Sequence, residues 1–161
     1  MTFVSHALSG VAVGVVLSEV TGVGLETTIP LSTAFSVLPD INLLWRKISD
    51  HHRDFTHYPS FWLVILVLSF ALEYFLQSSS FIVSLSLIIS VTTHLILDTF
   101  GIRLGVHWLA PFNYREFSFL GIDRTSRHLS EKEKALQFFR SKHVLYETVV
   151  IFSSLLLVWV F

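Results

Sequence analysis

A histidine and an aspartate stand four residues apart near the end of a long apolar stretch, in the segment SVTTHLILDTFG of residues 90–101. Residues four apart share one face of a helix, so His94 and Asp98 would present an imidazole and a carboxylate in the same direction. His143 and Glu147 repeat this spacing where the last apolar stretch begins. Ionisable side chains are costly in apolar helices and usually serve a function there, which makes the first pair a candidate site.

Three further residues have side chains of the same two kinds and lie near the ends of other apolar stretches: His6 opens the first, Asp40 closes the second and His57 precedes the third. Neutral imidazole nitrogens together with carboxylate oxygens suit a zinc-like divalent cation, whose charge offsets the repulsion between carboxylates. The chain has no cysteine, so a metal site could not use thiolate. Ordinary alternatives exist: His6 as a capping residue, Asp40 as a turn residue after a proline, and the four-residue pair as a polar contact between helices.

The elements that must position these residues are strongly apolar. Of the 161 residues 52% are hydrophobic and only 14% are charged, and the mean hydropathy of +0.65 is not that of a soluble domain. The apolar stretches are Phe3–Leu25, Ile29–Leu38, Ser60–Leu76, Phe81–Phe100 and Val144–Phe161. Helices of about 17 to 20 residues can span a bilayer, and only the second stretch is marginal. We therefore expect one all-α domain over residues 1–161, an integral membrane bundle of four to five apolar helices.

Tracing the chain through these helices places the candidate ligands on one side of the membrane. The first stretch leaves this side near His6, the second returns at Asp40, and the fourth returns at Asp98. All 11 lysine and arginine residues fall on the same side, which the positive-inside rule identifies as cytoplasmic. We expect an inner-membrane protein whose site faces the cytoplasm.

Five short motifs follow one another along the chain: SHALSG, LPDIN, HHRDFTHYP, HLILDTFG and WLAPF. In this order they resemble the motifs of the YdjM family of membrane-bound metal-dependent hydrolases. The resemblance extends from about Ser5 to Phe112. That family is in turn similar, more distantly, to the all-helical superfamily of zinc-dependent phospholipase C and single-strand nucleases.

The resemblance implies a phospholipase C-like cluster of two or three zinc ions, or of another divalent metal, at the helix ends. The first ion would be held by Asp40, His57, His94 and Asp98. A second would be held by His107, His143 and Glu147, and a third by His6 with Asp98 as a bridge. His51 and His52 are alternative or supporting ligands, and His57 is preferred to His52 because Thr56-His57-Tyr58 fits the superfamily pattern.

Such a site predicts metal-assisted hydrolysis of a phosphoester. Asp40 would also steer the proton of the attacking water, and Arg53 would neutralise phosphoryl oxygens. The alternative for Arg53 is an ordinary arginine of a cytoplasmic loop.

The polar stretch before the last helix favours a substrate held in the membrane. HWLAPFNYREFSFLGI is typical of an interfacial loop, and SEKEKALQFFRSK predicts an amphipathic helix that continues into the last apolar stretch. We expect a lipid-phosphate or amphipathic phosphoester substrate among membrane lipids. We expect no nucleic acid as a partner, because the sequence shows no stripe of lysine and arginine beyond those that the positive-inside rule accounts for. The alternative function is that of a non-catalytic membrane protein whose metal is structural or acts as a sensor.

Overall fold

The structure, a computed structural model, describes residues 2–45, 51–77, 81–100, 105–119, 133 and 142–160. Within these ranges the chain forms five α-helices and no strand beyond an isolated antiparallel bridge between Val106 and Phe117. The helices are α1 (Phe3–Thr21), α2 (Leu25–Val37), α3 (Pro59–Phe75), α4 (Ile82–Thr99) and α6 (Lys142–Val160). Three 3-10 turns are η1 (Leu38–Leu44), η2 (His51–Arg53) and η3 (Phe55–His57). The all-α prediction is confirmed for this part of the chain.

Two of these helices, α1 and α4, are long and apolar enough to cross a bilayer. The helix α3 and the Val144–Val160 part of α6 are apolar but shorter. The helix α2, which contains the apolar stretch Ile29–Val37, has only 13 residues and is short for a membrane span, as predicted. It also contains Pro30. Two candidate membrane spans are therefore found among the described residues, and a total of four to five stays a prediction. The predicted amphipathic helix before α6 lies outside the described residues.

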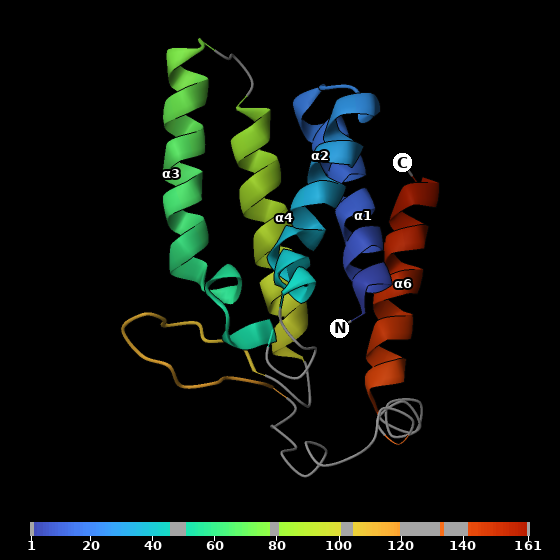
Figure 1. The fold of residues 1–161 in the computed structure, drawn as a ribbon. Coiled ribbons are helices and arrows are strands. Elements are labelled where there is room, and N and C mark those ends of the chain that lie inside the picture. The colour runs from blue at the N-terminus through green and yellow to red at the C-terminus, as the bar shows by residue number, and fades with distance from the viewer. Residues whose placement is uncertain are drawn as a thin grey trace.

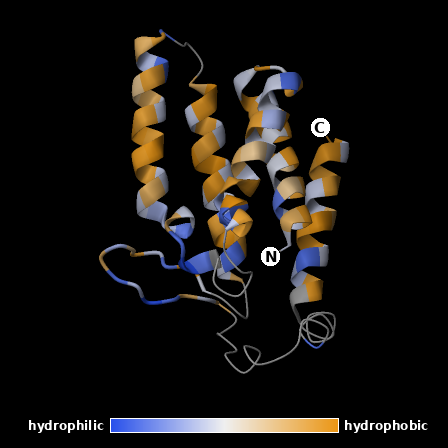
Figure 2. Ribbon diagram, in the orientation of Figure 1, coloured by the Kyte–Doolittle hydropathy of each residue, from blue (hydrophilic) through white to orange (hydrophobic). Residues whose placement is uncertain are grey.

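The chain segments that carry the candidate ligands meet at one end of the bundle. Figure 1 shows the start of α1, the η turns after α2, the start of α3, the end of α4 and the start of α6 at this end. Hydrophilic residues gather there, whereas the rest of α3 and α4 is largely hydrophobic (Figure 2). This is the arrangement that the membrane trace predicts for the helix ends.

The helices α1 and α2 pack closely because two glycines of α1 face α2. A Cβ atom on Gly10 would lie 2.7 Å from Cβ of Ser36, and one on Gly14 would lie 2.6 Å from Cα of Ile29. The Gly-x-x-x-Gly spacing thus lets the two backbones approach, as in many membrane helix pairs. The close packing of the two helices also lets the Ser36 hydroxyl of α2 donate to the carbonyl of His6 in α1, at 2.6 Å. The Ser9 hydroxyl of α1 donates to the same carbonyl, at 2.8 Å.

Glu73 is a buried carboxylate of α3 at the opposite end of the bundle from the η turns. It accepts hydrogen bonds from the backbone N–H groups of Val83 and Ser84, at 2.9 and 3.2 Å, and from the Ser84 hydroxyl. Backbone donors in the first turn of a helix have no partner within that helix. Glu73 therefore fixes the start of α4, the helix that carries His94 and Asp98.

We expect Glu73→Ala to lower the free energy of unfolding by about 1–3 kcal/mol, because it leaves buried backbone donors without an acceptor. Titration of the detergent-solubilised protein with a denaturing detergent, followed by circular dichroism, measures this loss. The matched control is Glu19→Ala, which removes an exposed carboxylate of α1 and should change stability by less than about 0.5 kcal/mol. Equal stability of the two variants would contradict the capping role.

Candidate metal centre

The centre begins with His94 and Asp98, both fully buried at the end of α4. Nδ1 of His94 lies 2.7 Å from the carbonyl oxygen of Ser36. Because a carbonyl oxygen only accepts, this hydrogen bond holds the proton of a neutral His94 on Nδ1 and leaves the Nε2 lone pair for a ligand. His94 Nε2 lies 3.0 Å from Oδ2 of Asp98. The two side chains do share one face of the helix, as their spacing predicts.

The turns η1 and η3 bring a second carboxylate and a second imidazole to this pair. His57 Nε2 lies 3.4 Å from Asp40 Oδ1, 3.4 Å from His94 Nε2 and 3.5 Å from Asp98 Oδ2. His94 Nε2 is 3.8 Å from the same oxygen of Asp40. One ligand atom from each of the four residues therefore lies within 4.8 Å of all the others.

Three hydrogen bonds hold the η3 turn that carries His57. Asp54 caps the turn: its Oδ1 accepts from the N–H of Phe55 at 2.8 Å, and its Oδ2 accepts from Nε1 of Trp45 at 3.1 Å. From the other side, Nε1 of Trp62 in α3 donates to the carbonyl of Thr56 at 2.6 Å. The imidazole of His57 is thus positioned by both its own loop and α3.

Five of the six separations among the four ligand atoms are close to those around a tetrahedral cation. In a zinc site with bonds of about 2.1 Å, tetrahedral angles separate neighbouring ligand atoms by about 3.4 Å. The separations that involve the nitrogens of His57 and His94 run from 3.0 to 3.8 Å. Two nitrogens and two oxygens are ligands that zinc accepts, and other divalent metals accept them too. The group formed by Asp40, His57, His94 and Asp98 could therefore hold one divalent cation.

Asp98 lies at the centre of a wider group of histidines. His6 Nε2 is 3.1 Å from Asp98 Oδ1, and His52 Nε2 is 3.2 Å from Asp98 Oδ2. The ring of His6 also stacks on that of His94, with centroids 3.8 Å apart. The sequence leaves open whether His52 or His57 is the ligand. In the structure both imidazoles lie beside Asp98, and His57 belongs to the four-residue group.

The charges of the centre are coupled. Burial raises the pKa of the Asp40 carboxyl, but the hydrogen bond with His57 and the nearby His94 outweigh burial and hold that pKa below its ordinary value. Burial lowers the pKa of His57, whereas hydrogen bonds with Asp40 and Asp98 raise it, and the net pKa lies above its ordinary value. Without metal, a proton on His57 is thus stabilised between two carboxylates. A bound cation would take over this role, and its binding would release the proton.

The chain matches, over residues 1–161, the family model described as YdjM inner membrane protein. It belongs to this family. No curated protein and no solved structure matches it. The family assignment agrees with the two candidate membrane helices and confirms the membrane class expected from composition. The more distant relationship to phospholipase C and single-strand nucleases stays a prediction.

Arg53 of this YdjM family member lies in η2, directly after His52. Its Nε and Nη2 atoms both donate to Oε1 of Glu116, at 3.1 and 2.9 Å. The guanidinium-bearing side chain is 44% exposed, whereas that of Glu116 is 10% exposed. Arg53 is thus a partly exposed cation that follows His52 directly in the chain. The Glu116 carboxylate, from the segment 105–119, holds its side chain in place.

Two of the remaining predicted ligands, His107 and Glu147, lie outside the four-residue group. His107 is buried and its ring packs edge-on against two tyrosine rings, with centroids 6.1 and 6.2 Å away. Glu147 accepts from the backbone N–H and the hydroxyl of Thr2, at 2.7 and 2.9 Å, and so ties α6 to the start of α1. The side chain of His143 lies outside the described residues.

Proposed function

We propose that this YdjM family member is a metal-dependent hydrolase that cleaves a phosphoester of a lipid at the cytoplasmic face of the inner membrane. The observation that carries the proposal is the convergence of two imidazole nitrogens and two carboxylate oxygens at the ends of apolar helices. Zinc is the proposed metal because this ligand set and spacing suit its tetrahedral site. Further ions, two or three in all, would use the ligands His6, His107, His143 and Glu147.

Each residue of the proposed centre has a separate task. Asp40, His57, His94 and Asp98 would hold the cation, which when bound supplies an acidified water and positive charge for the phosphoryl oxygens. The Asp40 carboxylate is the least buried of the four, with 8% of the residue exposed, and would take the proton of the attacking water. The Ser36 carbonyl orients His94, and His6 and His52 orient Asp98.

One observation favours a second candidate function. His57, His94 and Asp98 are fully buried, which is typical of closed, structural metal sites. A sensor or partner-binding membrane protein would need no open coordination position. The two candidates are separated by phosphoester turnover. The hydrolase releases phosphate or a phosphorylated head group from lipid when it is loaded with metal, and the structural protein binds metal without turnover.

We expect Arg53→Ala to lower turnover by roughly 100-fold, because this guanidinium is proposed to stabilise negative charge that develops on phosphoryl oxygens. The metal content should not change, since Arg53 lies outside the four-residue group. Phosphate release and metal analysis of the same preparation measure the two effects. The matched control is Arg115→Ala, an exposed arginine of the neighbouring segment, which should keep full turnover. Equal losses in both variants would point to general surface charge instead.

The cytoplasmic orientation predicts the result of a labelling experiment on a chain that has no native cysteine. A cysteine that replaces Gln77 should react in whole cells with a thiol reagent that crosses the outer but not the inner membrane. A cysteine that replaces Ser118 should react only after the inner membrane is permeabilised. Inverted labelling would place the metal centre on the periplasmic side.

A further inference from the structure

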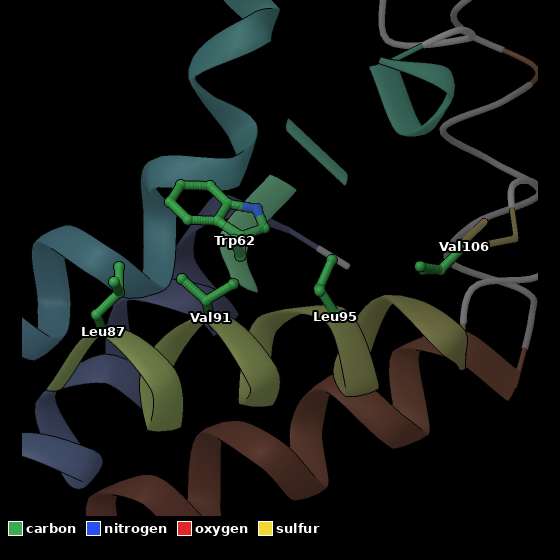
Figure 3. Packing of buried hydrophobic residues seen from close by; sticks show 5 residues of the cluster. All are labelled: Trp62, Leu87, Val91, Leu95 and Val106. Carbon is green, nitrogen blue, oxygen red and sulfur yellow. The ribbon is translucent and has the colours of Figure 1, made fainter. Parts of the chain in front are cut away.

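An apolar groove runs between α3 and α4 and opens toward the outside of the bundle. Its volume is about 260 Å³, and its walls include Trp62, Leu66, Leu87, Val91, Leu95 and Trp108. Figure 3 shows Leu87, Val91 and Leu95 in a row along α4, with the ring of Trp62 over this row. Two rim residues, Leu63 and Ile88, are 59% and 38% exposed, so the groove is accessible from the side where lipid would lie.

One end of the groove is built from neighbours of the metal-centre residues. Leu95 follows His94 in α4. Trp62 donates from Nε1 to the carbonyl of Thr56, the residue before His57, at 2.6 Å. At the same end Trp108 donates from Nε1 to the hydroxyl of Thr99, the residue after Asp98, at 3.0 Å. The groove therefore begins beside residues that adjoin the metal-centre residues in sequence, and it runs from there along α4 toward Leu87.

We propose that this groove binds one acyl chain of a phosphate-bearing lipid whose head group lies at the metal centre. The inference rests on the proposed function and names the part of the substrate that the protein recognises. From Leu95 to Leu87 the groove follows α4 for about 12 Å, the rise of eight helical residues. Its lining is almost wholly apolar, and its volume of about 260 Å³ lies just below the range for drug-sized ligand pockets, which begins at roughly 300 Å³. These dimensions suit a single unbranched hydrocarbon chain.

The test uses phosphatidic acid that carries a photoreactive diazirine in the middle of one acyl chain, in phosphatidylcholine vesicles containing the full-length, metal-loaded protein. After irradiation, mass spectrometry locates the cross-linked residues. We expect cross-links on the groove-lining residues of α3 and α4. Excess unlabelled phosphatidic acid should compete, and excess phosphatidylcholine should compete much less.

Two matched variants separate the groove from general contact with lipid. Ile88→Trp would fill the groove at its rim, whereas Ile96→Trp places the same side chain on α4 outside the groove, at a position that is 44% exposed. We expect the first variant to reduce cross-linking by about tenfold, equivalent to about 1.4 kcal/mol, and the second to leave it unchanged. Both should retain the wild-type metal content.

Three results would overturn the proposal: cross-links spread evenly over the exposed face of α3, cross-links concentrated on α1 and α6, or equal competition by the two lipids. Cross-linking requires no turnover, so its outcome remains distinct from that of the hydrolysis assay. A specific cross-link in the groove combined with a silent hydrolysis assay would reject the hydrolase and keep the lipid site.

Discussion

Asp98→Asn is expected to leave the purified protein without stoichiometric metal and, under the proposed function, without activity. The substitution conserves shape but removes the charge that would hold a cation and that attracts the surrounding imidazoles. Oδ2 of Asp98 lies within 3.5 Å of the Nε2 atoms of His52, His57 and His94, while Oδ1 contacts His6. No other described carboxylate has this central position. Loss of a hydrogen-bond partner of a ligand costs about 10- to 100-fold in metal affinity, so loss of the ligand itself should cost more.

Metal analysis of the detergent-purified variant, together with zinc titration by calorimetry, measures this effect. Glu73→Gln is the matched control, because it also converts a buried carboxylate to an amide but does so at the far end of the bundle. The control should bind metal with wild-type stoichiometry. His94→Ala should reproduce the loss seen in Asp98→Asn. Unchanged metal content in both centre variants would show that the four-residue group is only a polar contact between helices.

The core of the centre could be predicted from sequence because two simple periodicities determine it. The helical period places His94 and Asp98 on one face, and the predicted alternation of apolar helices across a membrane places Asp40 and His57 at the same end. Both rules act over whole helices and tolerate small errors in their bounds. The four residues that converge in the structure are those assigned to the first ion by the resemblance.

The position of His52 could not be predicted in this way. Adjacent histidines in a loop point in directions that depend on the exact turn, here the three-residue η2, and no periodicity determines such a turn. The contact of His52 with Asp98 therefore appears only in the structure. By contrast, the close packing of α1 on α2 had a local signal, the spacing of Gly10 and Gly14, that the prediction did not use.

The partners of Arg53 and Glu147 also differ from the sequence prediction, because both contacts join distant parts of the chain. Arg53 pairs with Glu116, 63 residues away, and Glu147 accepts hydrogen bonds from Thr2, 145 residues away. Neither partner could be chosen from the sequence, because many exposed carboxylates and hydroxyls were equally plausible. The Glu147 contact also has a structural consequence: it links α6 to the start of the helix that carries His6.

Removal of metal is expected to reduce the release of phosphate or of a phosphorylated head group from lipid micelles to the level of protein-free micelles, and zinc should restore it. The ligands lie where the helices end, so a scissile phosphoester would be held at head-group depth while its hydrocarbon part stays in the bilayer. A suitable assay presents phosphatidic acid and other lipid phosphates in mixed micelles to protein dialysed against a zinc chelator. Because the centre is buried, dialysis should be prolonged and the helical content checked afterwards by circular dichroism.

The pattern of restoration identifies the chemistry. Zinc should restore turnover at about one or more equivalents, whereas magnesium should not, because magnesium prefers six oxygen ligands and this centre supplies two imidazoles among four ligand atoms. A water-soluble phosphoester should be cleaved more slowly than the lipid if the membrane holds the substrate. If fully metallated protein releases neither phosphate nor a phosphorylated head group from any lipid in the series, the centre holds its cation for a structural or sensing role. The groove between α3 and α4 would then be a site for lipid binding without hydrolysis, which the cross-linking experiment detects independently.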